Sequence, residues 1–281
     1  MTGKPTSPFG GSVKSLNLPI EETPEVPWDD PGTWAVVEAP TDGSADSAPA
    51  IQKAVDSGAA TVFLASPQKI VIKSPVTIHG KVRRVIGCGN EPDYMRASRP
   101  DFIIADGDSP VVMFEHFGNI NGGVVVDTTR TIVFRSAATH VTFNKKCDVF
   151  LEDHCGGVTP LPGQRIWARQ LNIENQGTHL LNDNATLWIL GYKTERGGTL
   201  IHTRNGGKTE LFGTFSYTTT AGKLAPMFVT EDSSAFVYFT EVCYSRDPFA
   251  TLVRETRNGV TKTIERGQGG IAPYIGVAGD N

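Results

Sequence analysis

The chain has 281 residues, which is long enough for one buried core and too long for a miniprotein held together only by disulfides. Lys and Arg total 26 against 30 Asp and Glu, a formal charge of −4, and no long basic run is present, so nucleic acid is disfavoured as the main partner. With 30 glycines, 18 prolines and only 20% charged residues, the composition is typical of a turn-rich β protein.

Several functional patterns are missing from the sequence. No run approaches the roughly 18 apolar residues of a membrane span, and the first residues lack the apolar segment of a signal peptide, so we expect neither in this chain. No HExxH or CxxC spacing occurs, so we expect no metal site. The cysteines are too few for a disulfide framework, and we expect buried free thiols, with a disulfide as the alternative. They are Cys88, Cys147, Cys155 and Cys243.

Residues 1–33 contain six prolines and few aliphatic residues, which is typical of an extended arm. We expect this arm to lie along a core and to be anchored by Trp28 and Trp34.

Residues 47–57 are the best helix candidate. Ser47 would cap the free amides, Pro49 lies in the first turn and Gly58 ends the segment. A single short amphipathic helix ahead of a β region is expected to cover an apolar end. Its apolar face consists of Ile51, Ala54 and Val55.

From residue 61 onward, short apolar runs such as TVFLA and VTIHG alternate with turn residues, and no second helix is available for βαβ units. The runs repeat: Trp167 and Trp188 are 21 residues apart, and an insertion widens the spacing of Phe212 and Phe239 to 27. A period of 20 to 22 residues predicts a parallel β-solenoid with about three short strands in each coil.

Three segments carry a family pattern: DGSADS at 42–47, AIQKAV at 50–55 and VIGCG at 85–89. Together they resemble the opening of the right-handed parallel β-helix proteins of the pectate-lyase superfamily, in which a D-G-x-x-D-(S/T/D)-x-A-I-Q-x-A helix plugs the N-terminal end of the solenoid. The chain departs from that pattern after the first strand, where ASPQKI at 65–70 replaces Pro-x-Gly-x-Tyr.

From the repeat we expect an all-β solenoid over residues 34–267 with an irregular tail over 268–281, and the resemblance, which covers roughly residues 36–90, implies a right-handed parallel β-helix capped by the 47–57 helix. It also implies a polysaccharide as the partner and a secreted or periplasmic location, because the superfamily holds polysaccharide lyases, glycoside hydrolases, epimerases and phage tailspikes. Some relatives carry two solenoids, so the chain would be one half of a larger ancestor.

Strand alternation predicts a row of polar residues outside the solenoid. In LNIE at 171–174, Leu171 and Ile173 should face inward, so Glu174 faces outward. The repeat period carries this outward position to earlier and later coils. The predicted ladder is His154, Glu174, Glu195, Tyr217 and Tyr244.

Stacked carboxylates about 4.8 Å apart cannot both ionise freely, so we expect the pKa of one to rise. Such a pair suits a retaining glycosidase in which Glu174 and Glu195 are the catalytic nucleophile and acid. Tyrosines would stack on sugar rings, and Lys193 or Arg196 would hold an anionic sugar. The alternative is a solvated ladder that these two cations neutralise. The predicted substrate-binding residues are His154, Lys193, Arg196, Tyr217 and Tyr244.

β-Elimination would need other groups, namely a base beside a uronate and a cation, such as Ca²⁺, for the enolate. None of the acids forms a dense cluster, so we expect hydrolysis ahead of elimination and no cofactor, with Ca²⁺ only for a lyase. The candidate bases are Arg165, Arg169, Lys193 and Arg204. The candidate calcium ligands are Asp127, Glu152, Asp153 and Asp183.

An apolar patch is also expected on this face. If Glu195 faces outward, Phe215 does too, and with Val242 it makes a patch that monomers rarely leave bare. The arm, the residues beyond Thr256 or the other subunits of a homotrimer would cover it.

The carboxylate pair and the family resemblance together lead us to expect a polysaccharide-degrading enzyme. The alternative is a non-catalytic carbohydrate-binding or attachment solenoid.

Overall fold

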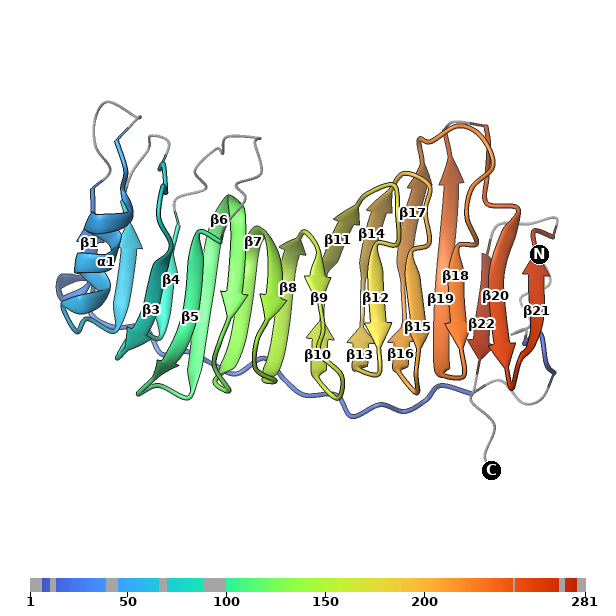
Figure 1. Cartoon of the computed structure of the whole chain (residues 1–281), viewed down its shortest axis with the longest axis horizontal. Helices are drawn as coiled ribbons and strands as arrows, with labels where there is room; N and C mark the ends of the chain where they lie inside the picture. The colour runs from blue at the N-terminus through green and yellow to red at the C-terminus, as the bar shows by residue number, and fades with distance from the viewer. Residues whose placement is uncertain are drawn as a thin grey trace. The chain divides into compact units, whose positions relative to one another are not determined.

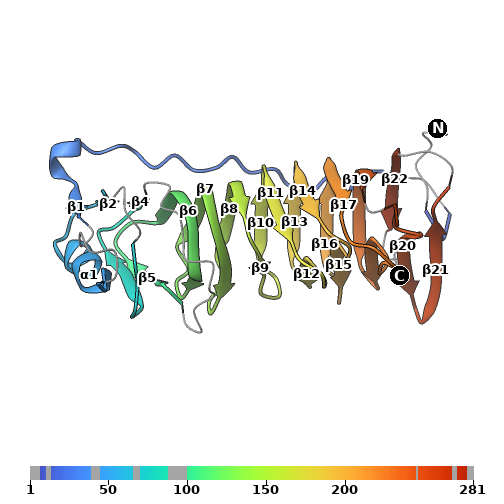
Figure 2. The same cartoon turned by 90° about the horizontal axis from the view of Figure 1, so that it is seen from above.

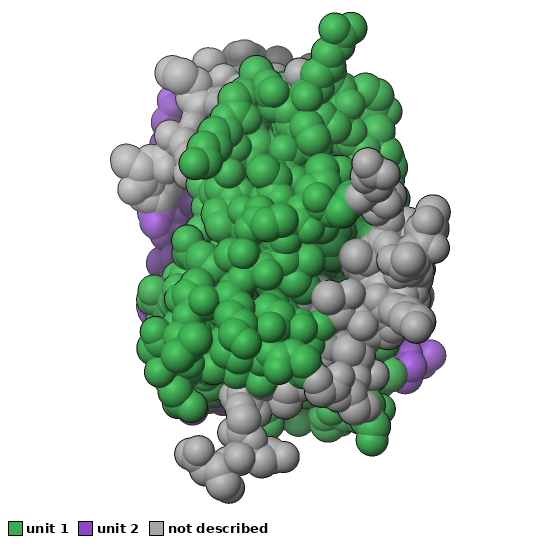
Figure 3. All heavy atoms as spheres, turned by 90° about the vertical axis from the view of Figure 1, so that its right-hand side faces the viewer, with its two compact units in different colours: residues 1–21, 159–281 green, residues 22–158 purple. Residues whose placement is uncertain are grey.

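The computed structural model describes residues 7–10, 14–38, 45–65, 70–87, 100–244, 246–267 and, by their backbone, 271–276. The chain forms two compact units (Figure 3). Unit 1 comprises residues 1–21 and 159–281, and unit 2 comprises residues 22–158. Strands dominate and most of them pair in parallel, so the prediction of an all-β protein is confirmed. The arm expected over residues 1–33 contributes to both units, residues 1–21 to unit 1 and residues 22–33 to unit 2.

Unit 2 stacks parallel strands behind a single described α-helix (Figure 1). Two rows of strands run through it, β1–β2–β4–β6–β7–β8 and β3–β5–β6, each strand pairing in parallel with the next. Its elements are η1 Pro31–Thr33, β1 Ala35–Val37, α1 Ala48–Asp56, β2 Thr61–Leu64, β3 Val76–Gly80, β4 Arg84–Ile86, β5 Phe102–Gly107, β6 Val111–Val126, β7 Thr131–Phe143 and β8 Asp148–Cys155; β9 Val158–Thr159 falls at the boundary.

Helix α1 confirms the predicted helix and packs against β1, β2 and β3, the first strands of unit 2. Its cap differs from the prediction: the Ser47 side chain makes no capping bond, and Asp46 Oδ1 instead accepts from the Ala48 amide at 3.1 Å. The same oxygen accepts from the Lys73 amide at 2.8 Å, so Asp46 ties the helix start to the following loop. The buried face consists of Ala48, Ile51, Ala54 and Val55.

Aromatic rings fill the interior of unit 2. Phe102, Phe114 and Phe134 are at most 1% exposed. The ring centroids of Phe102 and Phe114 lie 5.5 Å apart, and those of Phe114 and Phe134 lie 5.9 Å apart. Because β6 and β7 place Phe114 opposite Phe134, main-chain register sets this stack.

Unit 1 is built of three-stranded coils, each strand pairing in parallel with its equivalent one coil later (Figure 1). Trp167 pairs with Trp188 and Tyr192 with Thr214, which confirms the predicted period of 20 to 22 residues. The strands are β10 Arg165–Ala168, β11 Leu171–Glu174, β12 Leu180–Asp183, β13 Thr186–Ile189, β14 Tyr192–Glu195, β15 Ile201–Arg204, β16 Lys208–Leu211, β17 Thr214–Thr218, β18 Phe228–Glu231, β19 Ser234–Cys243, β20 Thr251–Arg257, β21 Val260–Glu265 and β22 Ile271–Gly276.

The predicted spacing of 27 residues between the last coils is wrong. β16 pairs Leu211 with Val237, an offset of 26, because the loop 219–227 lengthens this coil. β17 pairs Tyr217 with Val242, an offset of 25, because β19 runs on without the break that separates β16 from β17.

The C-terminal end of unit 1 also differs from the expectation of an irregular tail over 268–281. Ile271–Gly276 forms β22, which pairs antiparallel with β19. β21 pairs antiparallel with β20 across a tight turn in which Asn258 and Gly259 have φ of 49° and 76°. Antiparallel strands therefore cover β19 and β20, the last parallel strands of unit 1, which would otherwise present open edges.

The arm is held to unit 1 by one buried carboxylate. Residues 14–21 contain no helix or strand and lie beside the strands of unit 1 (Figure 2). Glu210 is 1% exposed and accepts from the amides of Asn17 and Leu18 at 3.2 and 3.0 Å. It also accepts from the Ser15 hydroxyl. All described partners of this carboxylate thus belong to the arm.

The same arm segment covers a tryptophan of the repeat. The Trp167 indole donates to the Pro19 carbonyl at 2.9 Å, and Arg169 donates to the Glu21 carbonyl at 2.8 Å. Trp167 and Trp188 are only 3% and 6% exposed. Both lie on the same side of the sheet as Glu210, because Trp167 pairs with Trp188 and Trp188 pairs with Glu210. The arm therefore turns part of the outer face of unit 1 into a second buried layer.

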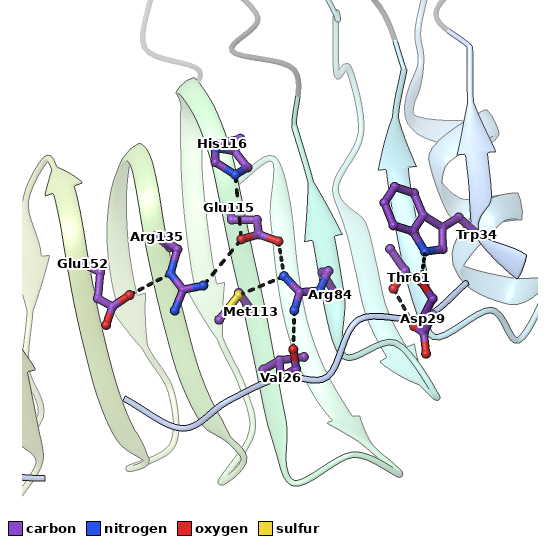
Figure 4. Close-up of polar contacts among 10 residues, drawn as sticks. All are labelled: Val26, Asp29, Trp34, Thr61, Arg84, Met113, Glu115, His116, Arg135 and Glu152. Carbon is purple, nitrogen blue, oxygen red and sulfur yellow. Dashed lines mark hydrogen bonds and ion pairs between the residues drawn. The ribbon is translucent and has the colours of Figure 1, made fainter. Parts of the chain in front are cut away.

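In unit 2 the arm is held by a buried cation (Figure 4). Arg84 is 1% exposed, pairs with Glu115 and donates to the Val26 carbonyl. Its guanidinium lies 3.8 Å from the ring centroid of Trp28, which stacks on Trp34 at 5.9 Å. The predicted tryptophan anchors are thus in contact with each other and with the core through Arg84.

We predict that Glu210→Gln loosens the arm. The amide group has one acceptor oxygen in place of two and brings an N–H group toward the arm's own donors, and charged hydrogen bonds contribute about 1.5–3 kcal/mol. Hydrogen exchange at Asn17 and Leu18 should accelerate about tenfold or more. Glu231→Gln, a change at a more exposed acid of unit 1, should leave exchange at the arm unchanged; equal exchange in both variants would contradict the role of Glu210.

Candidate functional site

The candidate site lies on one face of unit 1, where β11, β14 and β17 are neighbours. The strands pair Glu174 with Glu195 and Glu195 with Tyr217, as the repeat predicts. Leu171 and Ile173 are buried, so alternation turns Glu174 to the outer side. The second outward row of the same face is Asn172, Lys193 and Phe215.

Lys193 lies between the two glutamates. Its ammonium group donates to Oε1 of Glu195 at 2.6 Å and also to Oε1 of Glu174. Asn172 donates to the same Glu174 oxygen at 3.0 Å. The Lys193, Glu174 and Glu195 side chains are 28%, 31% and 24% exposed, so the cluster is partly desolvated. The structure thus brings both predicted catalytic residues together, but with a cation between them.

This cation decides the protonation state of Glu174. Partial burial by itself would raise the pKa of Glu174, but the hydrogen bond and charge of Lys193, together with Asn172, hold the pKa below its ordinary value. Burial likewise opposes the charge of Lys193, and the two glutamates outweigh it, so the pKa of Lys193 is raised. The expected rise is therefore wrong for Glu174, which is a carboxylate at neutral pH and has no proton to donate.

Aromatic side chains continue the face beyond the carboxylates. The Tyr217 ring centroid lies 4.9 Å from the Lys193 ammonium and 5.7 Å from the rings of Phe215 and Tyr244. Phe215 is 47% exposed and Tyr244 is 68% exposed. Tyr244 was expected opposite Tyr217, but the register partner of Tyr217 is Val242; the two tyrosine rings touch although their backbones are not paired.

Arg196 does not join the cluster. It follows β14 with φ of 70°, which turns the chain at the strand end. Within the described residues no ion pair links Arg196 to Glu174 or Glu195, which instead share Lys193. The cation expected beside the carboxylates is thus supplied by Lys193 alone.

His154 lies in unit 2 and faces inward, so its predicted place in an exposed ladder is wrong. Asp153 has φ of 54°, and this left-handed residue interrupts the alternation of β8. His154 is therefore 1% exposed, with its ring 5.5 Å from Phe134 at the end of the aromatic stack. Burial lowers the pKa of His154 to about 4.

One supporting residue escaped the sequence reasoning. His179 is buried behind Glu174, with Nδ1 2.7 Å from the Thr194 hydroxyl and Nε2 2.8 Å from the Asn175 carbonyl. Burial lowers the pKa of His179, against the opposing charge of Glu174. The residue therefore ties the end of β11 to β14. Its equivalent one coil later is Leu200, so the repeat offered no signal for it.

No family model, curated protein or solved structure matches the chain. The resemblance to the pectate-lyase superfamily thus stands on the sequence pattern. Of that pattern, residues 42–44, 66–69 and 88–89 lie outside the described part of the structure. No helix in the described residues is long and apolar enough to cross a membrane.

The groups proposed for calcium binding are engaged in ion pairs. Glu152 pairs with Arg135 at 2.7 Å in unit 2, beside buried Glu115 (Figure 4). Asp183 pairs with Arg204 at 2.6 Å in unit 1. Asp127 lies 3.9 Å from Lys145. Asp153 is the exception: it is the left-handed residue within β8, and no ion pair of Asp153 occurs among the described residues. Among the described residues no three His, Cys, Asp or Glu side chains are gathered for a metal ion.

The candidate lyase bases are engaged as well. Arg165 lies over the Trp167 ring at 5.1 Å, and Arg169 binds the arm. Arg204 pairs with Asp183, and Lys193 is shared by two glutamates. Each of the four cations is thus already in contact with an acid, an aromatic ring or the arm, which disfavours a role as a lyase base.

Among the described residues no disulfide joins two of the cysteines. Cys147 is buried, whereas Cys155 is exposed and Cys243 is intermediate, so the expected burial holds only for the first. Cys88 lies outside the described residues.

We predict that His154 makes unit 2 sensitive to acid. The folded chain holds His154 neutral down to a pKa of about 4, whereas an unfolded imidazole protonates near 6.5. Stability therefore falls as the pH drops from about 6.5 toward 4, by about 2 kcal/mol at pH 5. In urea unfolding at pH 7.5 and 5.0, His154→Leu should remove this loss, whereas His79→Gln, at an exposed histidine, should keep it. A wild-type pH dependence in His154→Leu would contradict the assignment.

We also predict that Lys193→Met raises the pKa of Glu174. Without the Lys193 cation, the charged register partner of Glu174 is Glu195. The negative charge of Glu195 disfavours the ionisation of Glu174 and therefore raises its pKa. Carboxyl ¹³C chemical shifts followed through a pH titration measure this pKa. Lys208→Met, on the exposed end of β16, should leave the titration of Glu174 as in the wild type; an unchanged Glu174 pKa in Lys193→Met would rule out Lys193 as the cause.

Proposed function

We propose that the chain is a carbohydrate-binding β-solenoid that holds a polysaccharide on the β11, β14 and β17 face of unit 1. The observation that carries this proposal is the exposed aromatic cluster of Phe215, Tyr217 and Tyr244 directly beside hydrogen-bonding carboxylates. Sugar rings have flat apolar faces and hydroxyl groups at their edges. The aromatic rings can stack on the apolar faces, and the neighbouring carboxylates can bind the hydroxyl groups.

The fold that we propose for these coils is the right-handed parallel β-helix. Parallel strands of one sheet joined by a crossover are right-handed in nearly all proteins, and each coil of unit 1 is such a connection. The DGSADS and AIQKAV segments support the same assignment through their resemblance to the pectate-lyase superfamily.

Binding is favoured over cleavage because of Lys193. A retaining glycosidase needs one protonated carboxyl group beside the nucleophile. Glu174 has a lowered pKa, and both glutamates bind the same ammonium group. The register of Glu174 opposite Glu195 makes hydrolysis the second candidate, which would require Lys193 to leave the pair.

We predict that Tyr244→Ala and Tyr217→Ala each weaken binding to a soluble polysaccharide about tenfold or more. Each loses an aromatic face, and burying such a side chain contributes about 1.5–3 kcal/mol. A glycan array identifies a ligand, and affinity electrophoresis with the matching polymer measures the loss. The matched control is Tyr238→Ala. Tyr238 is an exposed tyrosine of β19 whose register partner is Pro273 of β22.

Three outcomes would redirect the proposal. Release of reducing ends by the wild type, lost in Glu174→Gln and Glu195→Gln, would replace binding by hydrolysis. No binding to any neutral or anionic glycan would refute the carbohydrate function. A homotrimer in sedimentation that dissociates on Tyr244→Ala would assign the aromatic cluster to a subunit interface instead.

A further inference from the structure

The charged group of the candidate site has a net negative charge. Glu174 and Glu195 contribute two negative charges and Lys193 one positive charge, so the cluster carries −1. The neighbouring outward positions of β17, Phe215 and Tyr217, are uncharged.

The remaining cations near this face belong to turns. Arg196 follows the last residue of β14, Arg246 lies two residues after Tyr244, and Lys223 lies in the loop between β17 and β18. That loop reaches the face's edge where Thr220 accepts from the Gly197 amide at 2.9 Å. None of these three cations is in an ion pair with the glutamates within the described residues. Within the described strands β11, β14 and β17, Lys193 carries the one ammonium group, and the two glutamates already neutralise it.

An anionic sugar would meet an unfavourable site. A uronate carboxylate needs a cation with free donors, and it would have to compete with Glu174 and Glu195 for Lys193. Displacing either glutamate leaves several carboxylates close together in a partly desolvated place, where like charges repel.

A neutral sugar would find acceptors that are already in place. Lys193 and Asn172 both reach Oε1 of Glu174, and Lys193 reaches Oε1 of Glu195. The second oxygen of each carboxylate can accept from sugar hydroxyl groups without breaking these contacts. The adjacent rings of Tyr217 and Tyr244 can pack against the apolar face of a sugar without separating any ion pair.

We infer that this face selects uncharged, hydroxyl-rich polysaccharides and rejects polyuronates, an inference that rests on the proposed carbohydrate function and specifies its ligand class. Lys193 is the specificity determinant because it is bound by both Glu174 and Glu195. It keeps the two carboxylates ionised, so they can accept hydrogen bonds from sugar hydroxyl groups, and it has no charge left to neutralise an anionic sugar.

The test compares neutral glucans with polygalacturonate and alginate on the full chain. The wild type should bind at least one neutral glucan and bind both polyuronates at least tenfold more weakly. The double variant Glu174→Gln, Glu195→Gln changes the cluster from −1 to +1 at nearly constant shape. It should gain affinity for polygalacturonate about tenfold or more at low salt and lose that gain at 0.5 M salt.

The variant Glu25→Gln, Glu38→Gln is the matched control, since it makes the same change in net charge at exposed positions of unit 2. It should bind like the wild type. Equal or tighter binding of a polyuronate by the wild type would overturn the inference and leave the carbohydrate function standing, whereas no binding of any glycan would refute that function first. The wild-type comparison decides between these results even if the double variant does not fold.

Discussion

Main-chain pairing between equivalent strands is the constraint on which the rest of this protein depends. Once β11 is hydrogen-bonded to β14, Glu174 must lie opposite Glu195, and the next coil must place Tyr217 beside them. The strand register, and not the affinity of the side chains for one another, therefore decides which side chains of successive coils are neighbours. The consequence is chemical: like groups accumulate in rows, and a row of acids needs a cation, which Lys193 supplies from the adjacent row.

The same constraint explains where the chain is irregular. A coil closes only if the backbone turns between strands, and a left-handed residue such as Arg196 occurs at such a turn, whereas Asp153 is left-handed within β8. Each left-handed residue inside or after a strand reverses the alternation that follows. His154 is an interior residue for this reason, and it ends the aromatic stack of Phe102, Phe114 and Phe134.

Buried charges hold the arm. Glu210 in unit 1 and Arg84 in unit 2 are each 1% exposed, and each binds backbone groups of the arm. A buried charge without partners is strongly unfavourable, so these two residues make the docked arm part of the folded state rather than an addition to it. The arm in turn shields Trp167, whereas Phe215 and Tyr244 beside β17 remain exposed.

The sequence by itself determined the periodic part of the protein. The helix near residues 47–57, the coil length and the pairing of Glu174 with Glu195 followed from local spacing, because strand alternation and a repeat period translate directly into position. Only the tertiary structure decided the charge state of the site, the inward turn of His154 and the anchoring of the arm by Glu210. These depend on a side-chain distance, one backbone angle and a contact between residues almost 200 positions apart, none of which a local pattern encodes.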